Sequence, residues 1–186
     1  MGISKLVKHK GSRIMGIDAS THTIAYAIFD GETAVEWGEI FFDGGTIYER
    51  IVDAKRKIRA LRERFQVDFI ALESAIMVRS VNTGLKMAYV FGAIMGELLD
   101  NGATVVEVKP LEWQSFIGNK NFSKAEKDAV LKENPGRSAN WIRNRIRELR
   151  KQRTIEFVAS LGINVESDNV ADAAGIAWYA VNRLKA

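Results

Sequence analysis

Three acidic side chains border apolar segments, where burial would be costly without a partner, and a fourth lies close to one of them. Asp18 and Glu73 each end a short apolar run, and Asp172 precedes an apolar stretch, four residues after Asp168. An unpaired carboxylate in such surroundings is energetically expensive, and sharing a divalent cation offsets that cost. Two neighbouring ions held by three or four carboxylates can activate a water molecule and stabilise the leaving oxygen of a phosphodiester. These residues therefore predict a metal centre for phosphodiester hydrolysis.

The composition restricts which metal such a site could hold. The chain has no Cys and two His, which excludes disulfides, thiolate zinc sites, cysteine nucleophiles and a His-rich metal site. Oxygen ligands favour Mg²⁺ or Mn²⁺. The sequence contains no GxxxxGK[ST], GxGxxG or GxSxG motif, so we expect no nucleotide cofactor.

Residues beside these acids have more than one interpretation. Asp168 and Asp172 share a helix face if both are helical, but Asp168 or Asn169 could instead be the N-cap of that helix. His22 lies shortly after Asp18, where it is either a turn residue or a catalytic base. The sequence alone leaves these alternatives open.

Short apolar runs rich in β-branched and aromatic residues indicate the strands that position the acids. Five runs are expected to form strands, at residues 13–19, 24–30, 33–42, 67–73 and 103–108. The Asp30-Gly31 turn predicts an antiparallel hairpin between the second and third runs. Side chains at the ends of strands can converge on a ligand, because the backbone leaves the core there.

Apolar residues at helical spacing separate and follow the later strands. Helices are expected at residues 47–65, 85–99, 111 onward and 169–184. Gly92 and Gly96, one turn apart, predict a close approach of the second helix to a sheet, and Asn101-Gly102 should end that helix. The apolar spacing shifts phase after Leu149, which predicts a kink or break near residues 151–154.

This order of elements predicts an α/β fold. Three antiparallel strands, followed by strands that alternate with helices, imply a mixed five-stranded sheet with helices on both faces. We expect a basic leader at residues 1–12 and a single domain over residues 13–186, because no internal repeat or long linker divides the chain.

Basic side chains gather in two parts of the chain, whose formal net charge is +4. One is the leader, and the other is residues 137–153, where Glu148 is the single acid. Arg143, Arg147 and Arg150, at helical spacing beside an apolar stripe, would suit the phosphate backbone of a nucleic acid. A solvated basic helix is the alternative interpretation.

We find no targeting signal in the sequence. No run approaches the roughly 18 apolar residues of a membrane span. No apolar stretch follows the basic leader as it would in a signal peptide. We therefore expect a cytoplasmic protein without a membrane partner.

Four segments together resemble one known family. They are residues 13–21 (RIMGIDAST), 69–73 (FIALE), 88–96 (AYVFGAIMG) and 169–177 (NVADAAGIA). In this order they are similar to the RuvC-type Holliday-junction resolvases, members of the RNase H-like superfamily, and the similarity spans most of residues 13–184. The resemblance implies an RNase H-like fold, dependence on Mg²⁺ or Mn²⁺, a homodimer, and paired symmetric nicks across four-way DNA junctions.

Position by position, the resemblance implies that Asp18, Glu73 and Asp172 are catalytic metal ligands. The family's fourth ligand, an Asp or His, usually stands three residues before the last one, where this chain has Asn169. Either the helix start is shifted so that Asp168 ligates, or Asn169 supplies a neutral oxygen. We favour Asp168.

Further contacts with DNA are expected outside the acids. The candidate lysines, which are either phosphate contacts or ordinary surface residues, are Lys109, Lys120 and Lys127. In resolvases that this chain resembles, a residue just after the catalytic Glu enters the junction centre. Here Ile76 or Met77 would be that wedge, although the family often has Phe there, and dimer packing explains these residues equally well. The large aromatic residues expected in the core or an interface are Trp113, Phe116, Trp141 and Trp178.

Other functions remain to be weighed against a junction resolvase. One is an RNase H-like nuclease that acts on other branched DNA or on RNA–DNA hybrids. Another is a non-cleaving junction-binding protein, but a pure binder has no reason to place four carboxylates near phosphates. The segment GIDAST also resembles the first phosphate loop of actin-like and sugar-kinase ATPases. Those proteins need two lobes, and 186 residues hold only one.

Overall fold

A five-stranded mixed sheet forms the centre of the molecule. The computed structural model describes residues 12–74, 81–100 and 102–184. The strands are β1 (Arg13–Ala19), β2 (Thr23–Asp30), β3 (Thr33–Phe41), β4 (Phe69–Glu73) and β5 (Thr104–Val108), and their order in the sheet is β3-β2-β1-β4-β5. β1, β2 and β3 pair antiparallel, whereas β4 is parallel to both β1 and β5. The mixed five-stranded sheet predicted from the sequence is confirmed.

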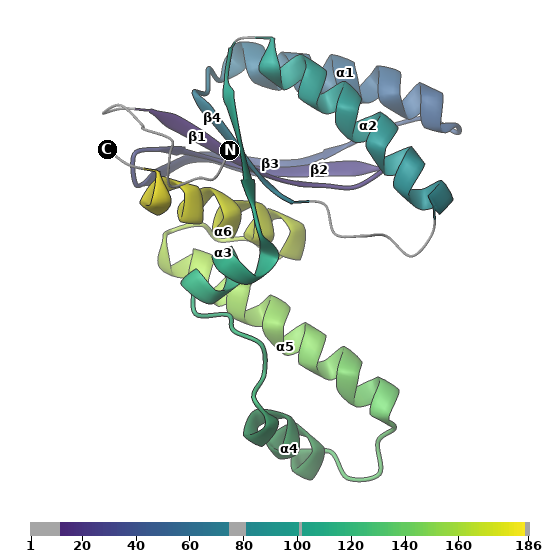
Figure 1. Cartoon of the computed structure of the whole chain (residues 1–186), viewed down its shortest axis with the longest axis vertical. Helices are drawn as coiled ribbons and strands as arrows, with labels where there is room; N and C mark the ends of the chain where they lie inside the picture. Colours follow the sequence, from purple (N-terminus) through teal and green to yellow (C-terminus); the bar gives the residue numbers. More distant parts are fainter. Residues whose placement is uncertain (1–11, 75–80, 101, 185–186) are drawn as a thin grey trace.

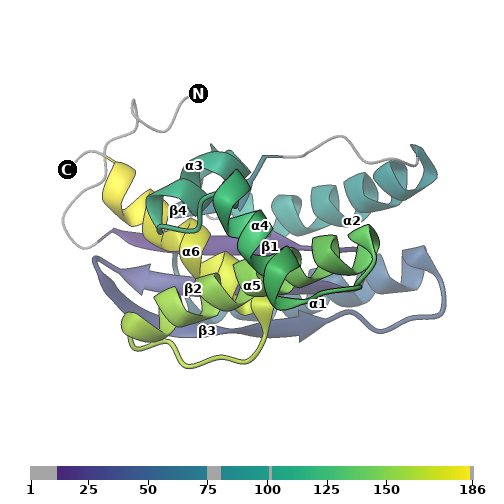
Figure 2. The same cartoon turned by 90° about the horizontal axis from the view of Figure 1, so that it is seen from below.

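Helices cover both faces of this sheet. In the described residues they are α1 (Ile47–Arg64), α2 (Val81–Leu99), α3 (Pro110–Phe116), α4 (Lys124–Glu133), α5 (Ala139–Ser160) and α6 (Asp168–Arg183). α1 and α2 lie on one face and α6 on the other (Figure 1), and Figure 2 views the sheet from the side of α6. Alternation along β1 sends Ile14 into the core beneath α6 and Met15 into the core beneath α1 and α2. None of the described helices is long and apolar enough to cross a membrane.

α6 lies close to the sheet because β1 has a glycine beneath it. A Cβ at Gly16 would lie 2.1 Å from the carbonyl oxygen of Ala173 and 2.7 Å from the Cβ of Ala177. Any side chain at Gly16 would therefore push the helix away. The small residues on both elements hold the N-terminal turns of α6 beside the end of β1.

The role predicted for Gly92 and Gly96 is wrong. A Cβ at either position would meet nothing within 4 Å, so these glycines do not approach the sheet. The buried face of α2 is formed by Val90, Ile94 and Leu98. Two helical residues span about 200°, so Gly92 and Gly96 face away from that side. Gly16 makes the close approach instead.

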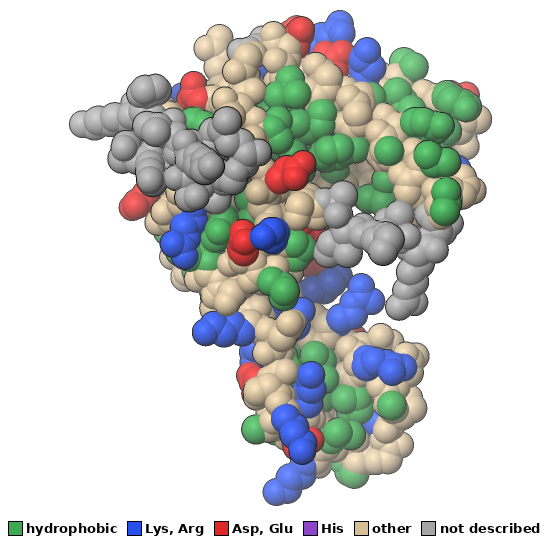
Figure 3. Space-filling model, viewed as in Figure 1, with side chains coloured by type: hydrophobic (Ala, Val, Ile, Leu, Met, Phe, Trp, Pro, Cys, Tyr) green, Lys and Arg blue, Asp and Glu red, His purple; other side chains and the backbone are tan. Residues whose placement is uncertain are grey.

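The break or kink predicted at residues 151–154 is also wrong, because α5 is one uninterrupted helix. Its apolar spacing changes phase because its two halves pack against different partners. Ile142, with Ile146 and Leu149 beside it, packs in a small cluster with α4, whereas Val158 belongs to the core beneath α6. α4 and residues 139–150 of α5 consequently project from the sheet as an arm (Figures 1 and 3).

Candidate active site

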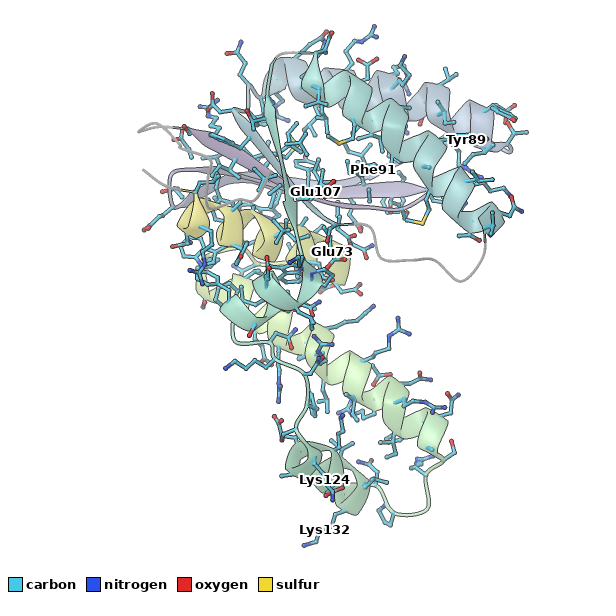
Figure 4. All side chains as sticks on the ribbon, in the orientation of Figure 1. Glu73, Tyr89, Phe91, Glu107, Lys124 and Lys132 are labelled. Atoms are coloured by element: carbon cyan, nitrogen blue, oxygen red, sulfur yellow. The ribbon has the colours of Figure 1, made fainter. Side chains whose placement is uncertain are left out.

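The ends of β1 and β4 place Asp18 and Glu73 near each other. The two strands are parallel neighbours with Ile17 opposite Leu72, so the acids occupy the next position on each strand. Because side chains alternate along a strand, Asp18 shares the face of Gly16, which contacts α6. Glu73 shares this face and lies beside α3 at the end of β4 (Figure 4).

The first turns of α6 bring Asp168 and Asp172 to the same end of the sheet. The N-cap is Ser167, whose Oγ accepts a hydrogen bond from the backbone N–H of Val170 at 3.4 Å. The interpretation of Asp168 or Asn169 as the N-cap is therefore wrong, because both lie inside the helix. Asp168 lies in the first turn of α6, where the positive end of the helix dipole stabilises its carboxylate.

Asp18, Glu73, Asp168 and Asp172, hereafter the acidic cluster, influence one another electrostatically. The pKa of Asp172 is raised to about 7, first by burial and then by the negative charges of the other three members. The pKa of Asp18 is raised to about 6, first by burial and then by the charges of Glu73 and Asp168. Residues far apart in the sequence therefore form one group of carboxylates with too little positive charge around it.

Lys151 supplies part of the missing positive charge. Its Nζ forms an ion pair with Asp168, and its charge lowers the pKa of both Asp18 and Asp172. The sequence indicated Lys151 only as part of a broad basic surface. Its place at the acidic cluster follows from the packing of the second half of α5 against α6, which no local pattern reveals.

Glu39 is a further carboxylate near the cluster that sequence reasoning missed. Ala25 of β2 pairs with Asp18 on one side and with Glu39 of β3 on the other, and the charge of Glu39 raises the pKa of Asp18. Asn169 Nδ2 donates a hydrogen bond of 2.8 Å to Glu39 Oε1. Asn169 therefore contacts β3, while Asp168 contacts Lys151 of α5.

Glu73 and His22 also make polar contacts at this end of the sheet. Trp113 Nε1 donates a hydrogen bond of 2.9 Å to Glu73 Oε1. His22 lies in the turn after β1, with Nδ1 2.9 Å from Thr21 Oγ1 and Nε2 3.0 Å from Arg50 Nη1. Because a guanidinium only donates, Nε2 is the acceptor in that contact. Both ring nitrogens of His22 are therefore engaged within the protein.

The acidic cluster fits a divalent cation in its donor chemistry and in its charge. Carboxylate oxygens are ligands that Mg²⁺ and Mn²⁺ prefer. The pKa values of Asp18 and Asp172 are raised first by burial and then by neighbouring negative charges, and a bound cation would offset both effects. Across the described residues, no three Asp, Glu or His side chains are already arranged as metal ligands. Because Lys151 already pairs with Asp168, a cation bound there would compete with that ion pair.

The candidate DNA-contacting lysines and arginines are spread from the end of β5 to the arm. Lys109 is the N-cap of α3 and pairs with Glu112 at 3.4 Å. Lys120 is exposed between α3 and α4, and Lys127 is exposed on α4. Arg143 and Arg147 are exposed on the arm half of α5. Ile76 and Met77 lie outside the described residues.

Arg150 differs from the other arginines of the predicted stripe because it joins the arm to α3. Its Nη2 donates to Gln114 Oε1 at 2.6 Å and to the carbonyl oxygen of Asn119 at 3.5 Å. The buried Asn119 in turn donates from Nδ2 to the Arg150 carbonyl at 2.8 Å and to Thr154 Oγ1 at 2.9 Å. Arg150 is thus engaged in the joint at the base of the arm.

Residues 14–133 match the family model described as crossover junction endodeoxyribonuclease RuvC. The chain belongs to the RuvC family. RuvC proteins of Chloroflexus aurantiacus and Chloroflexus aggregans are 29% identical to it over 104 and 103 residues, 53% of this chain. The chain covers 63% of the length of each of these relatives. Asp18 and Glu73 lie inside the segment matched to RuvC, whereas Lys151, Asp168 and Asp172 follow it.

The similarity in fold to solved structures covers more of the chain than the segment matched to the family model. T. thermophilus RuvC in complex with a Holliday junction substrate has a TM-score of 0.64 at 14% identity, covering 90% of this chain and 91% of that one. The yeast mitochondrial Holliday junction resolvase Ydc2 has a TM-score of 0.57 at 14% identity, covering 96% and 82%. The RNase H-like fold expected from the resemblance is confirmed.

Proposed function

We propose that this chain is a structure-selective DNA endonuclease that resolves four-way junctions by metal-dependent hydrolysis with paired symmetric nicks. The observation that supports the proposal is the register that sets Asp18 beside Glu73 at the ends of β1 and β4. The charges of Glu73 and Asp168, with burial, also raise the pKa values of Asp18 and Asp172. Membership of the RuvC family supports the reaction class. The complex of T. thermophilus RuvC with a Holliday junction supports the substrate.

In this proposal, Asp18, Glu73, Asp168 and Asp172 hold Mg²⁺, and Mn²⁺ can substitute. The bound metal would activate the attacking water and stabilise the leaving oxygen. The protein's own contribution is to collect carboxylates at one end of the sheet and to keep them partly buried. Asp168 is a better candidate than Asn169 for the fourth ligand, because its charge acts on Asp18 and Asp172, whereas the Asn169 amide bonds to Glu39.

DNA phosphates would contact basic side chains that are spread from the end of β5 to the arm. The proposed contacts are Lys109, Lys120, Lys127, Arg143 and Arg147. Figure 3 shows Lys and Arg side chains on the arm and where it meets the sheet domain. Arg150 would act indirectly, by holding the arm through Gln114 and Asn119. Such contacts make binding fall steeply as salt rises.

A homodimer would supply the two equivalent active sites that symmetric nicks require. The outer face of α2 is a candidate surface for it, with Leu85 and Tyr89 51% and 52% exposed. Leu85, Tyr89, Gly92, Gly96 and Leu99 recur at steps of four and three residues, the spacing of a helix that packs along another helix. A hollow of about 580 Å³ between α1 and α2 is lined by Gly92 and Gly96 among others. Figure 4 labels Tyr89 on this helix.

The test is incubation of the protein with labelled four-way, fork, flap and RNA–DNA hybrid substrates, each in Mg²⁺ and in Mn²⁺. Symmetric nicks in the four-way substrate are the expected result, and Asp18→Asn is the control for contaminating nucleases. Cleavage confined to flaps or hybrids would favour an RNase H-like nuclease of another specificity. Tight junction binding without cleavage in either metal would favour a junction-binding protein and overturn the nuclease proposal.

A further inference from the structure

Trp113 connects the Glu73 carboxylate to the protein interior. Its side chain is 1% exposed, and its indole Nε1 donates the 2.9 Å hydrogen bond to Glu73 Oε1. An indole N–H is a donor without acceptor capacity, so this contact persists only while an accepting oxygen faces it. Because burial fixes the ring, the hydrogen bond restricts rotation of the Glu73 carboxylate.

α6 holds the same ring from the other side. A Cβ at Gly175 would lie 2.8 Å from Cζ3 and 3.1 Å from Cε3 of Trp113, so the absence of a side chain there makes room for the indole. Gly175 follows Asp172 by three residues, which puts both on neighbouring parts of one helix side. Trp113 thus packs against the helix that carries Asp172 while it bonds to Glu73.

The local sequence explains how Trp113 reaches this position. Glu73 pairs in register with Val108, the last residue of β5. α3 begins almost at once, with Lys109 as N-cap and Pro110 in its first turn, where the missing N–H of proline costs nothing. One turn of helix then returns Trp113 over the end of β4, and its backbone N–H donates to the Lys109 carbonyl at 3.3 Å.

We propose that Trp113 is a positioning residue for Glu73, whose N–H holds one carboxylate oxygen and leaves the other to face the acidic cluster. The role of Glu73 as a metal ligand rests on the proposed function. Groups that orient metal ligands typically change metal affinity or activity by roughly 10- to 100-fold when they are removed. The indole therefore belongs to the metal site as well as to the core.

The first test compares Trp113→Phe, which keeps an aromatic ring and removes the N–H, with wild type. Mn²⁺ affinity is measured by isothermal titration calorimetry without DNA, and circular dichroism checks the fold. We expect Trp113→Phe to bind Mn²⁺ roughly 10-fold more weakly or worse. Trp178→Phe is the matched control, because Trp178 packs against Phe29 at a ring separation of 5.8 Å. Affinity of folded Trp113→Phe within about twofold of wild type would overturn the proposal.

The second test needs no substitution of Trp113. The chain has four tryptophans, so indole ¹⁵N–H signals can be assigned by substituting the other three. The Trp113 signal should move on Mg²⁺ addition, and it should also move in Glu73→Gln. If either change leaves the signal in place, the positioning role is refuted. Junction cleavage by wild type is scored separately. Its absence counts against the proposed function, whereas normal cleavage with an unmoved signal counts against Trp113 alone.

Discussion

Lys151 of α5 and Asp168 of α6 form an ion pair at the edge of the acidic cluster. The same helix carries Arg143 and Arg147 on the arm, about two turns and about one turn before Lys151. α5 therefore extends from the candidate DNA surface to the candidate metal site as one uninterrupted helix. DNA bound at the arm would therefore contact the same helix that carries Lys151, the ion-pair partner of Asp168.

Replacing Lys151 with Gln should destabilise the metal-free protein at pH 8. The substitution removes the charge that lowers the pKa of Asp18 and Asp172, so repulsion in the cluster increases. Because both partners are partly exposed, we expect a decrease of about 1–3 °C in Tm. Thermal unfolding in a chelating buffer measures it, and Lys132→Gln on α4 is the control. An equal effect from both substitutions would contradict a specific role for Lys151.

Stability of the metal-free protein should fall as pH rises from 5 to 8. The folded-state pKa values of Asp18 and Asp172, about 6 and about 7, lie above the ordinary value of an aspartate. Their contribution to stability is therefore present at low pH and lost as pH rises through those values. Asp172→Asn should stabilise the metal-free protein by roughly 1–3 kcal/mol at pH 8 and much less at pH 5. A pH-independent effect in chemical denaturation would refute this assignment.

Asp18→Asn, Glu73→Gln and Asp172→Asn should each abolish junction cleavage in Mg²⁺ and leave junction binding intact. Each change removes a charged donor and keeps the side-chain size. Gel-based cleavage and binding assays on one labelled four-way junction separate the two effects. Retained cleavage in any of these variants would remove that residue from the site.

The same assays compare Asp168→Ala with Asn169→Ala to identify the fourth ligand. We expect the loss of activity in Asp168→Ala, because Asp168 acts electrostatically on Asp18 and Asp172. A larger loss in Asn169→Ala would reverse that assignment.

Neutralising Arg143 and Arg147 together should weaken junction binding and flatten its salt dependence. Each lost phosphate contact lowers the slope of log affinity against log salt by about 0.9, so the double variant should lose about 2. Arg150→Gln should instead lower the free energy of unfolding by about 1–2 kcal/mol, because it removes donors to Gln114 and Asn119. Titration at several salt concentrations and urea unfolding measure the two effects. An unchanged slope in the double variant would exclude these arginines from the DNA surface.

Tyr89→Glu should convert a dimer into a monomer without unfolding it. Tyr89 is 52% exposed on the proposed α2 surface, so a charge there costs little in the monomer and much inside an apolar interface. Tyr48→Glu on α1, where the side chain is 71% exposed, is the control. Analytical ultracentrifugation gives the masses. A monomeric wild type, or a dimeric Tyr89→Glu, would exclude this surface.

The order of strands and helices was predictable because it depends on local patterns. Apolar runs rich in β-branched and aromatic residues and the Asp30-Gly31 turn indicate β2 and β3. The acids that end β1 and β4 are visible because they interrupt apolar runs. The Gly92 and Gly96 prediction failed because small residues permit close packing equally against a sheet and on an outer surface. The phase shift in α5 was correctly detected, but a change of packing partner caused it.

From its sequence alone, the protein's fold class and the candidate carboxylates could be named. Asp18, Glu73 and Asp172 are conspicuous because each borders an apolar segment, and Asp168 stands one helical turn before Asp172. Only the tertiary structure brought Lys151, Glu39 and Trp113 to that end of the sheet. The tertiary structure also showed that Arg150 joins the arm to α3, unlike the exposed Arg143 and Arg147. Contacts between segments tens of residues apart depend on how the elements pack, and no local pattern encodes that packing.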